Sequence, residues 1–387
     1  MKILFTTYSG LGEGGAEVST KILMEGLKER GHDIFIASSG DYENVFKFKK
    51  IKNIPFYSYH NFYLKRFFCN IIKKNKIEII YAQDRLTSIP AILAAKECNI
   101  KSIVHFRDYW FVCPKSSCLM PNGKECKVCK ISNLIKCSSF KRILWDYKKL
   151  IYLKKNRKTL NKANIKFANS NAVKEKLELC GIKDIIIMPI LRDFKSISNG
   201  NGKNIKEKYS LKKNVVTFIG GLTYSKGIMN MIKIMPYILE KNKNVSFLIV
   251  GDGPLFNKIK NMKINDVILT GRLDLKLMKN IYAASDIILL PSLWQEPFSG
   301  ILLEAAAMKK SIISSNTGGS KEILEDGKTG YLIDPLDLNE WKEKIELLIK
   351  DKKLREKIGK EWHDIAKKNY DKNVIVKRIE NVWNNRL

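Results

Sequence analysis

The sequence lacks the features that mark membrane-spanning, repetitive and disordered chains. No apolar run in its 387 residues approaches the roughly 18 residues that a bilayer-spanning helix needs, and there is neither a short repeat nor a low-complexity tract. Hydrophobic residues make up 45% and charged residues 28%, which excludes wholesale disorder. The first residues break at positions 8–10 without a long apolar core or a cleavage site. We therefore expect a first strand instead of a signal peptide, and a cytoplasmic protein.

Acidic residues are also scarce, with 39 Asp and Glu against 70 Lys and Arg, a net charge of +31. Residues 101–166 alone hold 17 basic and 3 acidic groups. Such a field favours a polyanionic partner, but no recognised nucleic-acid motif accompanies it, so we expect no nucleic acid. Residues 141–158 carry eight basic groups and one acid among apolar side chains. This segment is either a solvated basic helix or an interfacial helix that binds the surface of an anionic membrane.

Strand and helix patterns alternate along both halves of the chain, which predicts parallel β–α–β units and an α/β fold. Residues 196–204, SISNGNGKN, have no apolar pattern and are the best candidate for a linker. Two such halves predict a cleft, with ligands bound at the carboxyl ends of the strands.

Residues 291–322 carry the densest functional signal. A predicted strand ends at Pro291, Glu296 follows in a ligand loop outside any core, and a helix opens near Gly300. The first-turn amides of that helix would bind an anion, helped by the helix dipole. Glu304 lies in its first turns and suits a ribose diol, whereas Glu296 suits sugar hydroxyls. After the next strand, Gly318 and Gly319 predict a tight turn with free amides.

The spacing of Glu296 and Glu304 resembles the E-x7-E motif of the family-4 (group 1) retaining glycosyltransferases of GT-B fold. The resemblance covers roughly residues 4–340. The other matching positions, in the order of the family, are Gly14 and Gly15, Ser225 to Gly227, Gly251 to Pro254, Gly271 to Leu273, Gly318 with Glu322, and residues 330–335. Each motif alone is weak, but together and correctly spaced they are specific.

This resemblance implies two Rossmann-like domains that face each other across a cleft. The acceptor-side domain would span residues 1–192, the nucleotide-sugar-binding domain 193–370, and a helix at 371–387 would pack back on the first domain. The donor would be a nucleotide-diphosphate sugar and the acceptor a lipid-linked or other envelope glycan at the cytoplasmic face of the membrane. The resemblance also implies same-face attack without a protein nucleophile. No Asp-x-Asp motif is present, so we expect no catalytic metal.

The family pattern assigns roles to individual residues. Lys226 would neutralise the diphosphate, with Arg272 as a second cation, and Glu296 would hold the donor sugar. Glu304 would hold the ribose, and Gly14 with Gly15 would approach the diphosphate from the other domain. The remaining donor-binding candidates are Gly221, Gly251, Phe298, Ser299 and Gly300.

The sequence departs from the family in three places. Gly221 stands where an Arg is usual, and residues 189–193 lack the usual Asn-Gly turn. A His-Asp pair commonly follows the strand at residues 103–106, but here Arg107 and Asp108 follow it and His105 comes two positions early. His105 and Asp108 are therefore both candidates for the catalytic position facing the reacting sugar. The departures also leave open an alternative, a noncatalytic, decayed transferase that acts as a basic membrane-associated scaffold or glycan-binding protein.

Five of the eight cysteines crowd into an insert at residues 110–140 that has no apolar periodicity. They are Cys113, Cys118, Cys126, Cys129 and Cys137. The Cys126-x-x-Cys129 pair, preceded by an Asn122-Gly123 turn, matches zinc-ligand spacing, and four of the five thiolates would complete a structural site. Unpaired thiols, disulfides and iron–sulfur ligation are the alternatives. Because the insert follows Asp108, we expect it to flank and shape the acceptor cleft.

Overall fold

A computed structural model describes residues 1–8, 14–40, 44–49, 57–121 and 125–386. The chain divides into two compact units, and the first joins Met1–Leu191 with the C-terminal segment Lys372–Leu387. The second unit is Arg192–Asp371. These limits lie within one residue of the domain boundaries expected from the sequence.

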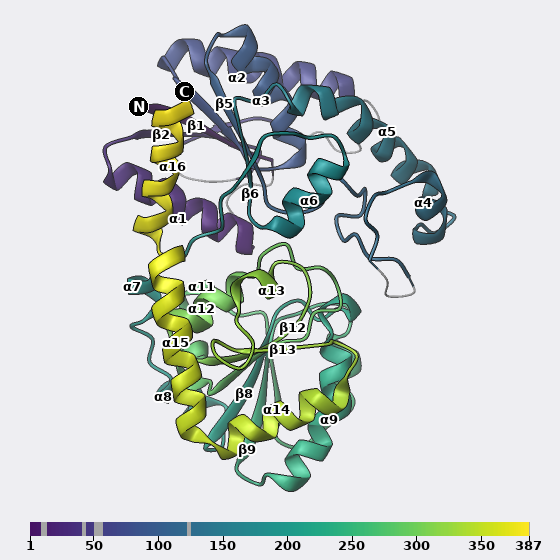
Figure 1. Cartoon of the computed structure of the whole chain (residues 1–387), viewed down its shortest axis with the longest axis vertical. Helices are drawn as coiled ribbons and strands as arrows, with labels where there is room; N and C mark the ends of the chain where they lie inside the picture. The colour runs from purple at the N-terminus through teal and green to yellow at the C-terminus, as the bar shows by residue number, and fades with distance from the viewer. Residues whose placement is uncertain (9–13, 41–43, 50–56, 122–124, 387) are drawn as a thin grey trace. The chain divides into compact units, whose positions relative to one another are not determined.

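The N-terminal unit contains a seven-stranded parallel sheet in the order β3-β2-β1-β4-β5-β6-β7 (Figure 1). Its strands are β1 (Lys2–Thr7), β2 (Asp33–Ser38), β3 (Val45–Lys47), β4 (Ile79–Ala82), β5 (Lys101–Phe106), β6 (Ile165–Ala168) and β7 (Ile185–Ile187). Its helices are α1 (Gly15–Glu29), α2 (Tyr57–Asn75), α3 (Arg85–Glu97), α4 (Ile131–Cys137), α5 (Ile143–Leu160), α6 (Asn171–Leu179) and α16 (Lys372–Arg386). The strand order reverses between β1 and β4, where ligands bind in open α/β sheets.

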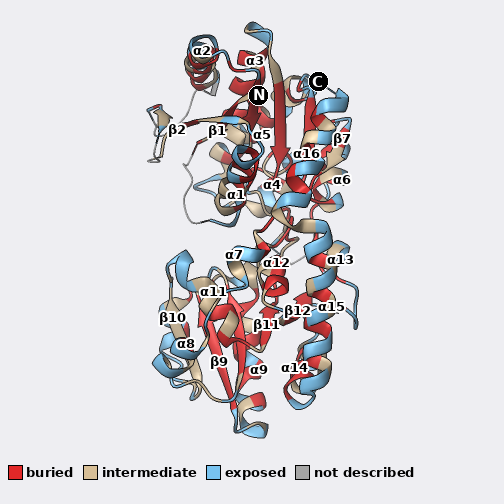
Figure 2. Cartoon of the chain, turned by 90° about the vertical axis from the view of Figure 1, so that its left-hand side faces the viewer, coloured by how far each residue is buried: buried red, intermediate tan, exposed pale blue. Residues whose placement is uncertain are grey.

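Helices cover both faces of this sheet, because successive side chains of a strand point to opposite faces. Ile3 and Phe5 of β1 pack with α1 and α16, whereas Leu4 packs with α2 and α3. The central strands β4, β5 and β6 are almost wholly buried, the edge strand β3 is not, and the outward helix faces are exposed (Figure 2). The C-terminal helix α16 therefore completes the core of the N-terminal unit.

The C-terminal unit contains a six-stranded parallel sheet in the order β10-β9-β8-β11-β12-β13. Its strands are β8 (Asn214–Ile219), β9 (Val245–Val250), β10 (Val267–Gly271), β11 (Ile287–Leu290), β12 (Ser311–Ser315) and β13 (Tyr331–Ile333). Its helices are α7 (Phe194–Ile197), α8 (Lys203–Lys208), α9 (Ile228–Lys241), α10 (Phe256–Lys260), α11 (Leu275–Ala284), α12 (Gly300–Ala307), α13 (Ser320–Ile323), α14 (Leu338–Lys350) and α15 (Lys352–Tyr370), with a 3-10 turn η1 (Tyr224–Lys226). Here the strand order reverses between β8 and β11.

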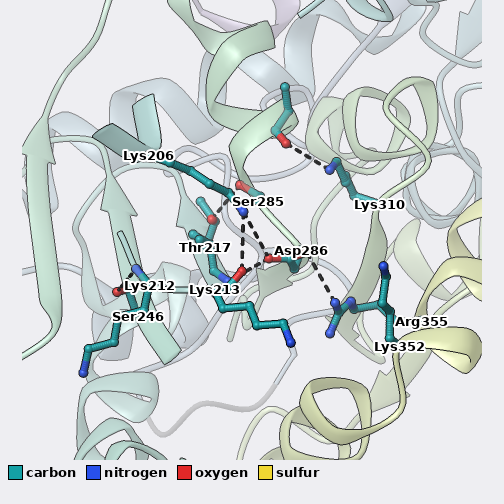
Figure 3. Close-up of polar contacts among 12 residues, drawn as sticks. Lys206, Lys212, Lys213, Thr217, Ser246, Ser285, Asp286, Lys310, Lys352 and Arg355 are labelled. Atoms are coloured by element: carbon teal, nitrogen blue, oxygen red, sulfur yellow. Dashed lines mark hydrogen bonds and ion pairs between the residues drawn. The ribbon is translucent and has the colours of Figure 1, made fainter. Parts of the chain in front are cut away.

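A polar network fixes the amino-terminal end of β11, the end opposite the one where ligands are expected. The carboxylate of Asp286 accepts a hydrogen bond from the amide of Val215 at 2.9 Å and pairs with Arg355 at 3.4 Å and Lys206 at 3.9 Å (Figure 3). One carboxylate thereby ties β8, β11, α8 and α15 together.

The segment 196–204 is not a linker between the units, contrary to the sequence prediction. It lies within the C-terminal unit and packs against α11. A Cβ on Gly200 would overlap the backbone of Lys279, and a Cβ on Gly202 would overlap the backbone of Ala284. The glycines therefore allow this segment to approach α11 closely. From composition alone, a segment rich in Ser, Asn and Gly that packs in this way cannot be told from a flexible linker.

Candidate active site

An ion pair spans the point where the strand order of the C-terminal unit reverses. Lys226 follows β8 and Glu296 follows β11, and the Lys226 Nζ lies 2.5 Å from the Glu296 Oε1. Gly227 has φ +73°, and a Cβ there would overlap the carbonyl oxygen of Pro291. A glycine is therefore needed for the β8 loop to lie against the end of β11. This local geometry places in contact two residues that the family resemblance assigned to different parts of the donor, Lys226 to the diphosphate and Glu296 to the sugar.

Three donors converge on one oxygen of Glu296. Besides Lys226, the Ser292 hydroxyl donates to Oε1 at 2.7 Å and the Trp294 Nε1 donates at 2.9 Å. The Lys226 ammonium also lies 5.1 Å from the centre of the Trp294 ring, within cation–π range. Glu296 is 4% exposed, so the expectation that it lies outside any core is wrong. Sequence reasoning missed Ser292 and Trp294, although both lie within four residues of Glu296.

The turn at Gly318 and Gly319 supports the Glu296 loop. The Gly318 amide donates to the Gln295 side chain at 2.8 Å, and the Gly319 amide donates to the Glu296 carbonyl at 2.6 Å. Gly318 has φ +53°, and a Cβ there would overlap the same carbonyl. The tight turn is present, but the prediction that its amides are free is wrong, because packing against the preceding loop satisfies them.

Glu304 is the centre of a second network on α12. Its Oε1 accepts from the Arg192 Nε at 2.7 Å and its Oε2 accepts from the Tyr282 hydroxyl at 2.6 Å. Arg192 is 1% exposed, and burial together with the neighbouring carboxylate raises the pKa of Tyr282 well above its ordinary value. The side chain of Glu304 keeps 21% exposure, so it stays accessible to a ligand. Arg192 lies in the stretch where the sequence departs from the family, and its pairing with Glu304 was not predicted.

The start of α12 is packed tightly. Ser299 is its N-terminal cap and is 6% exposed, and the Phe298 ring lies 5.6 Å from the Tyr370 ring. A Cβ on Gly300 would overlap the Arg192 guanidinium. These contacts fix the direction of the helix N-terminus, which is the group predicted to bind an anion.

The remaining donor-site candidates follow the carboxyl ends of neighbouring strands. The amide of Leu222, after β8, donates to the carbonyl of Asp252, after β9, at 2.9 Å. A Cβ on Gly251 would overlap the carbonyl of Gly220, whereas a Cβ on the exposed Gly221 would meet only the Asp252 carbonyl oxygen, at 3.9 Å. Arg272 is exposed at the end of β10. One edge of the sheet thus carries all the candidates of this unit.

In the N-terminal unit, Gly14 is the N-terminal cap of α1 and Gly15 begins the helix. Arg107, which follows β5, donates to the Ala16 carbonyl at 2.6 Å and to the Thr20 hydroxyl at 3.0 Å. Arg107, which takes the position of the family's His, therefore holds the first turn of α1 to the end of β5.

His105 and Asp108 occupy different environments. The Nδ1 of His105 lies 2.9 Å from the Tyr81 hydroxyl and its Nε2 lies 3.0 Å from the Met188 carbonyl, and the residue is 2% exposed. Burial and the Arg107 charge lower the pKa of His105 well below its ordinary value. This geometry favours a structural role for His105. Asp108 is only partly buried in the fold, at the end of β5, and desolvation raises the pKa of its carboxyl to about 7. It is the stronger acceptor-side candidate.

All eight cysteines lie in the described residues, and none forms a disulfide. The Cys118 thiol hydrogen-bonds to Cys113 and lowers the pKa of Cys113 to about 6, and the Cys126 amide donates to the Cys118 carbonyl at 2.7 Å. Cys129 packs with Leu134 and Leu150. Within the described residues, no three His, Cys, Asp or Glu side chains are grouped so as to hold a metal ion. The expected Asn122-Gly123 turn lies outside the described residues.

Two family models match the chain and together cover most of it. The model described as "Glycosyl transferases group 1" matches residues 201–363, and the model described as "Glycosyltransferase Family 4" matches residues 13–190. These regions contain the C-terminal site and the N-terminal glycine turn.

Curated relatives and solved structures agree with these matches. A capsular polysaccharide biosynthesis glycosyltransferase, CapM of Staphylococcus aureus, is 27% identical over 49% of this chain and 52% of its own length. The spore coat protein SA of Bacillus subtilis is 29% identical over 44% of this chain and 48% of its own length. The chain thus matches about half of each of these relatives. The structure of Anabaena Alr3699/HepE in complex with UDP covers 100% of both chains, with a TM-score of 0.75 and 18% identity. This likeness confirms the GT-B fold.

Proposed function

Because the chain belongs to the group 1 glycosyltransferases and has their GT-B fold, we propose that it transfers a sugar from a nucleotide-diphosphate donor to a glycan acceptor. The Lys226–Glu296 ion pair at the reversal point of the C-terminal sheet carries this proposal. That edge is where open α/β sheets bind their ligands, and it presents a cation, two anchored carboxylates and a helix N-terminus.

The chemical task of the site is to stabilise the leaving nucleoside diphosphate. Lys226 would share its positive charge between Glu296 and the diphosphate, and the N-terminus of α12 would contribute its dipole. Glu296 would accept hydrogen bonds from hydroxyls of the donor sugar, and Glu304, held by Arg192 and Tyr282, would accept from the ribose. Donors fixed in advance need little reorganisation when charge develops on the leaving group.

We propose a retaining reaction, in which the acceptor hydroxyl attacks from the face that the diphosphate leaves. This stereochemistry follows from the family resemblance and requires neither a protein nucleophile nor a metal. Asp108 would accept the hydrogen bond of the acceptor hydroxyl in the N-terminal unit.

The acceptor is proposed to be a lipid-linked or other envelope glycan at the cytoplasmic face of the membrane. CapM is named for capsular polysaccharide biosynthesis, and a lipopolysaccharide outer core galactosyltransferase, WaaB, shares the fold with a TM-score of 0.67. None of the helices that the structure describes is both long and apolar enough to cross a bilayer. We propose that contact with the membrane is peripheral, through the basic N-terminal unit.

The test is a transfer assay with a panel of nucleotide sugars and envelope-glycan acceptors. UDP-sugars come first, because HepE has been seen with both UDP and UDP-glucose. We expect a product whose anomeric configuration, read by nuclear magnetic resonance, matches that of the donor. An inverted product would refute the retaining mechanism. Binding of a donor without transfer or hydrolysis would favour the noncatalytic alternative, to which the Gly221 departure gives some weight.

A further inference from the structure

The start of α5 and the helix before it present large apolar side chains to solvent. Of the 17 exposed large apolar side chains in the described part of the chain, five lie within residues 131–147. They are Ile131, Ile135, Phe140, Leu144 and Tyr147, and we call this group the α4–α5 tip. Phe140 is 96% exposed, although burying a phenylalanine is worth about 1.5–3 kcal/mol. A concentration of such residues marks an interaction surface.

The same stretch of chain as the α4–α5 tip carries exposed basic side chains. They are Lys127, Lys130, Lys136, Lys141, Arg142 and Lys148. The single acidic residue between positions 126 and 174 is Asp146, which is buried and bonded to the Ser138 hydroxyl at 2.9 Å and to Lys149 at 3.5 Å. No carboxylate is exposed within residues 126–174, and the exposed Glu125 beside Lys127 is paired with Lys176. The surface is therefore apolar and positive.

The cysteine-bearing insert holds this surface in place. Cys129 packs with Leu134 of α4 and Leu150 of α5, and the Lys115 ammonium donates to the carbonyl of Cys137 at the end of α4. Together with the Ser138–Asp146 hydrogen bond, these contacts fasten α4 to α5 at the side of the N-terminal unit (Figure 1). The cysteine-bearing insert, α4 and α5 are thus packed together as one structural unit.

We propose that the α4–α5 tip docks on an anionic lipid bilayer, with its apolar side chains at the boundary between headgroups and acyl chains and its basic side chains among the headgroups. The inference rests on the proposed function in placing the acceptor at a membrane, but it assigns the contact to a defined surface. Basic amphipathic surfaces of this kind bind anionic lipid through buried apolar area and charge together.

The structure shortens the part of the interfacial helix, expected at residues 141–158, whose apolar side chains could enter a membrane. Leu150, Leu153 and Leu160 of α5 are buried against the protein, so the second half of the helix offers only charge to a membrane. A nucleic acid would use the basic side chains and leave Phe140 and Leu144 without a role. A second copy of the chain would bring two positive surfaces together, which is unfavourable.

Binding is measured by co-sedimentation of the full chain with vesicles of phosphatidylcholine, with or without phosphatidylglycerol. Neither donor nor acceptor is present, so this experiment is independent of sugar transfer, and a failure of membrane docking is distinguished from a failure of the proposed transfer. Wild-type protein should bind the anionic vesicles and be released by high salt. Binding to neutral vesicles to the same extent, or no binding to anionic ones, would overturn the proposal.

Two variants separate the apolar and basic contributions. Phe140→Ser with Leu144→Ser should weaken vesicle binding at least about tenfold, since both side chains would leave the lipid. Its control is Leu336→Ser, an exposed leucine of the C-terminal unit, which should bind like wild type. Because Phe140 and Leu144 are exposed, the thermal midpoint should not change.

The charge variant replaces Lys136, Lys141, Arg142 and Lys148 with Gln, and we expect about a fivefold loss per charge. Its control removes four exposed lysines of α15, Lys352, Lys353, Lys357 and Lys360. Equal losses in both would show that net charge, and not the α4–α5 tip, drives binding, and would overturn the proposal. The proposal is also wrong if the serine variant binds normally while RNA displaces the vesicles, or if wild type dimerises through this surface.

Discussion

The substitution Glu296→Gln should separate donor binding from sugar transfer. In the wild type, Glu296 neutralises Lys226 at 2.5 Å and also accepts from Ser292 and Trp294. Gln keeps the shape and one acceptor oxygen but removes the charge. Lys226 is then available to the diphosphate alone, so we expect UDP to bind about fivefold more tightly, an effect of about 1 kcal/mol in a partly screened site. The charged hydrogen bond that the Glu296 carboxylate would accept from a donor-sugar hydroxyl is lost, and a hydrogen bond to a charged group is worth about 1.5–3 kcal/mol. Turnover should therefore fall about 10- to 150-fold.

The assay combines steady-state transfer with calorimetric titration of UDP. Glu325→Gln is the matched control, because Glu325 pairs with Lys328 at 2.8 Å on an exposed turn of the same unit. It should leave turnover and UDP affinity unchanged. The thermal midpoint of the Glu296 variant should fall by only about 2–8 °C, for a loss of about 1–2 kcal/mol. Unchanged turnover, or a loss of UDP affinity that parallels the loss of turnover, would refute this reasoning. Glu296→Ala is less informative, because it leaves the Trp294 and Ser292 donors unpaired in the interior.

Individual residues give three further predictions. Gly221→Arg introduces the cation usual in the family at an exposed position where a Cβ meets no atom closer than 3.9 Å, so it should tighten UDP binding several-fold, whereas Gly221→Ala should not. The pKa of Asp108 is raised by burial to about 7, so its stabilising effect is present below about pH 4 and is lost as the pH rises through 7. Asp108→Asn should therefore raise the thermal midpoint relative to wild type at pH 8 but not at pH 4, and an equal difference at both values would show that the carboxyl does not titrate there. On the hypothesis of a structural zinc site, elemental analysis of protein purified without chelator should find about one zinc per chain. Less than a tenth of that amount, together with thiols that titrate freely in the native protein, would show that the cysteines are unpaired instead.

Much of the fold could be predicted because the hydrophobic pattern fixes strand and helix order locally. Alternating elements predict parallel strands, whose carboxyl ends lie at one edge. The family resemblance placed both Lys226 and Glu296 in the donor site. The pair at 2.5 Å shows that this edge brings together residues 70 positions apart. The glycine turns at Gly227 and Gly318 could also be predicted, since their backbone conformations disfavour other residues.

The partners of these residues could not be predicted, because they depend on packing between distant segments. Arg192 lies 112 positions before Glu304 and reaches it only because the chain enters the C-terminal unit beside α12. The amides of Gly318 and Gly319 are satisfied by the loop after β11, which the turn sequence does not specify. His105 resembled a catalytic residue by its position near a strand end, but the strand is buried and both ring nitrogens have partners in the core.

The central claim is that the Lys226–Glu296 edge binds the diphosphate of a nucleotide sugar. Its most direct test is calorimetric titration of the purified full chain, as wild type and as Lys226→Ala, with a panel of nucleotide-diphosphate sugars. We predict saturable binding of one donor per wild-type chain for at least one member of the panel, weakened about tenfold or more in the variant, in line with the loss of a charged hydrogen bond of about 1.5–3 kcal/mol. Binding that is equal in both proteins, or no binding of any nucleotide sugar to the wild type, would contradict the account.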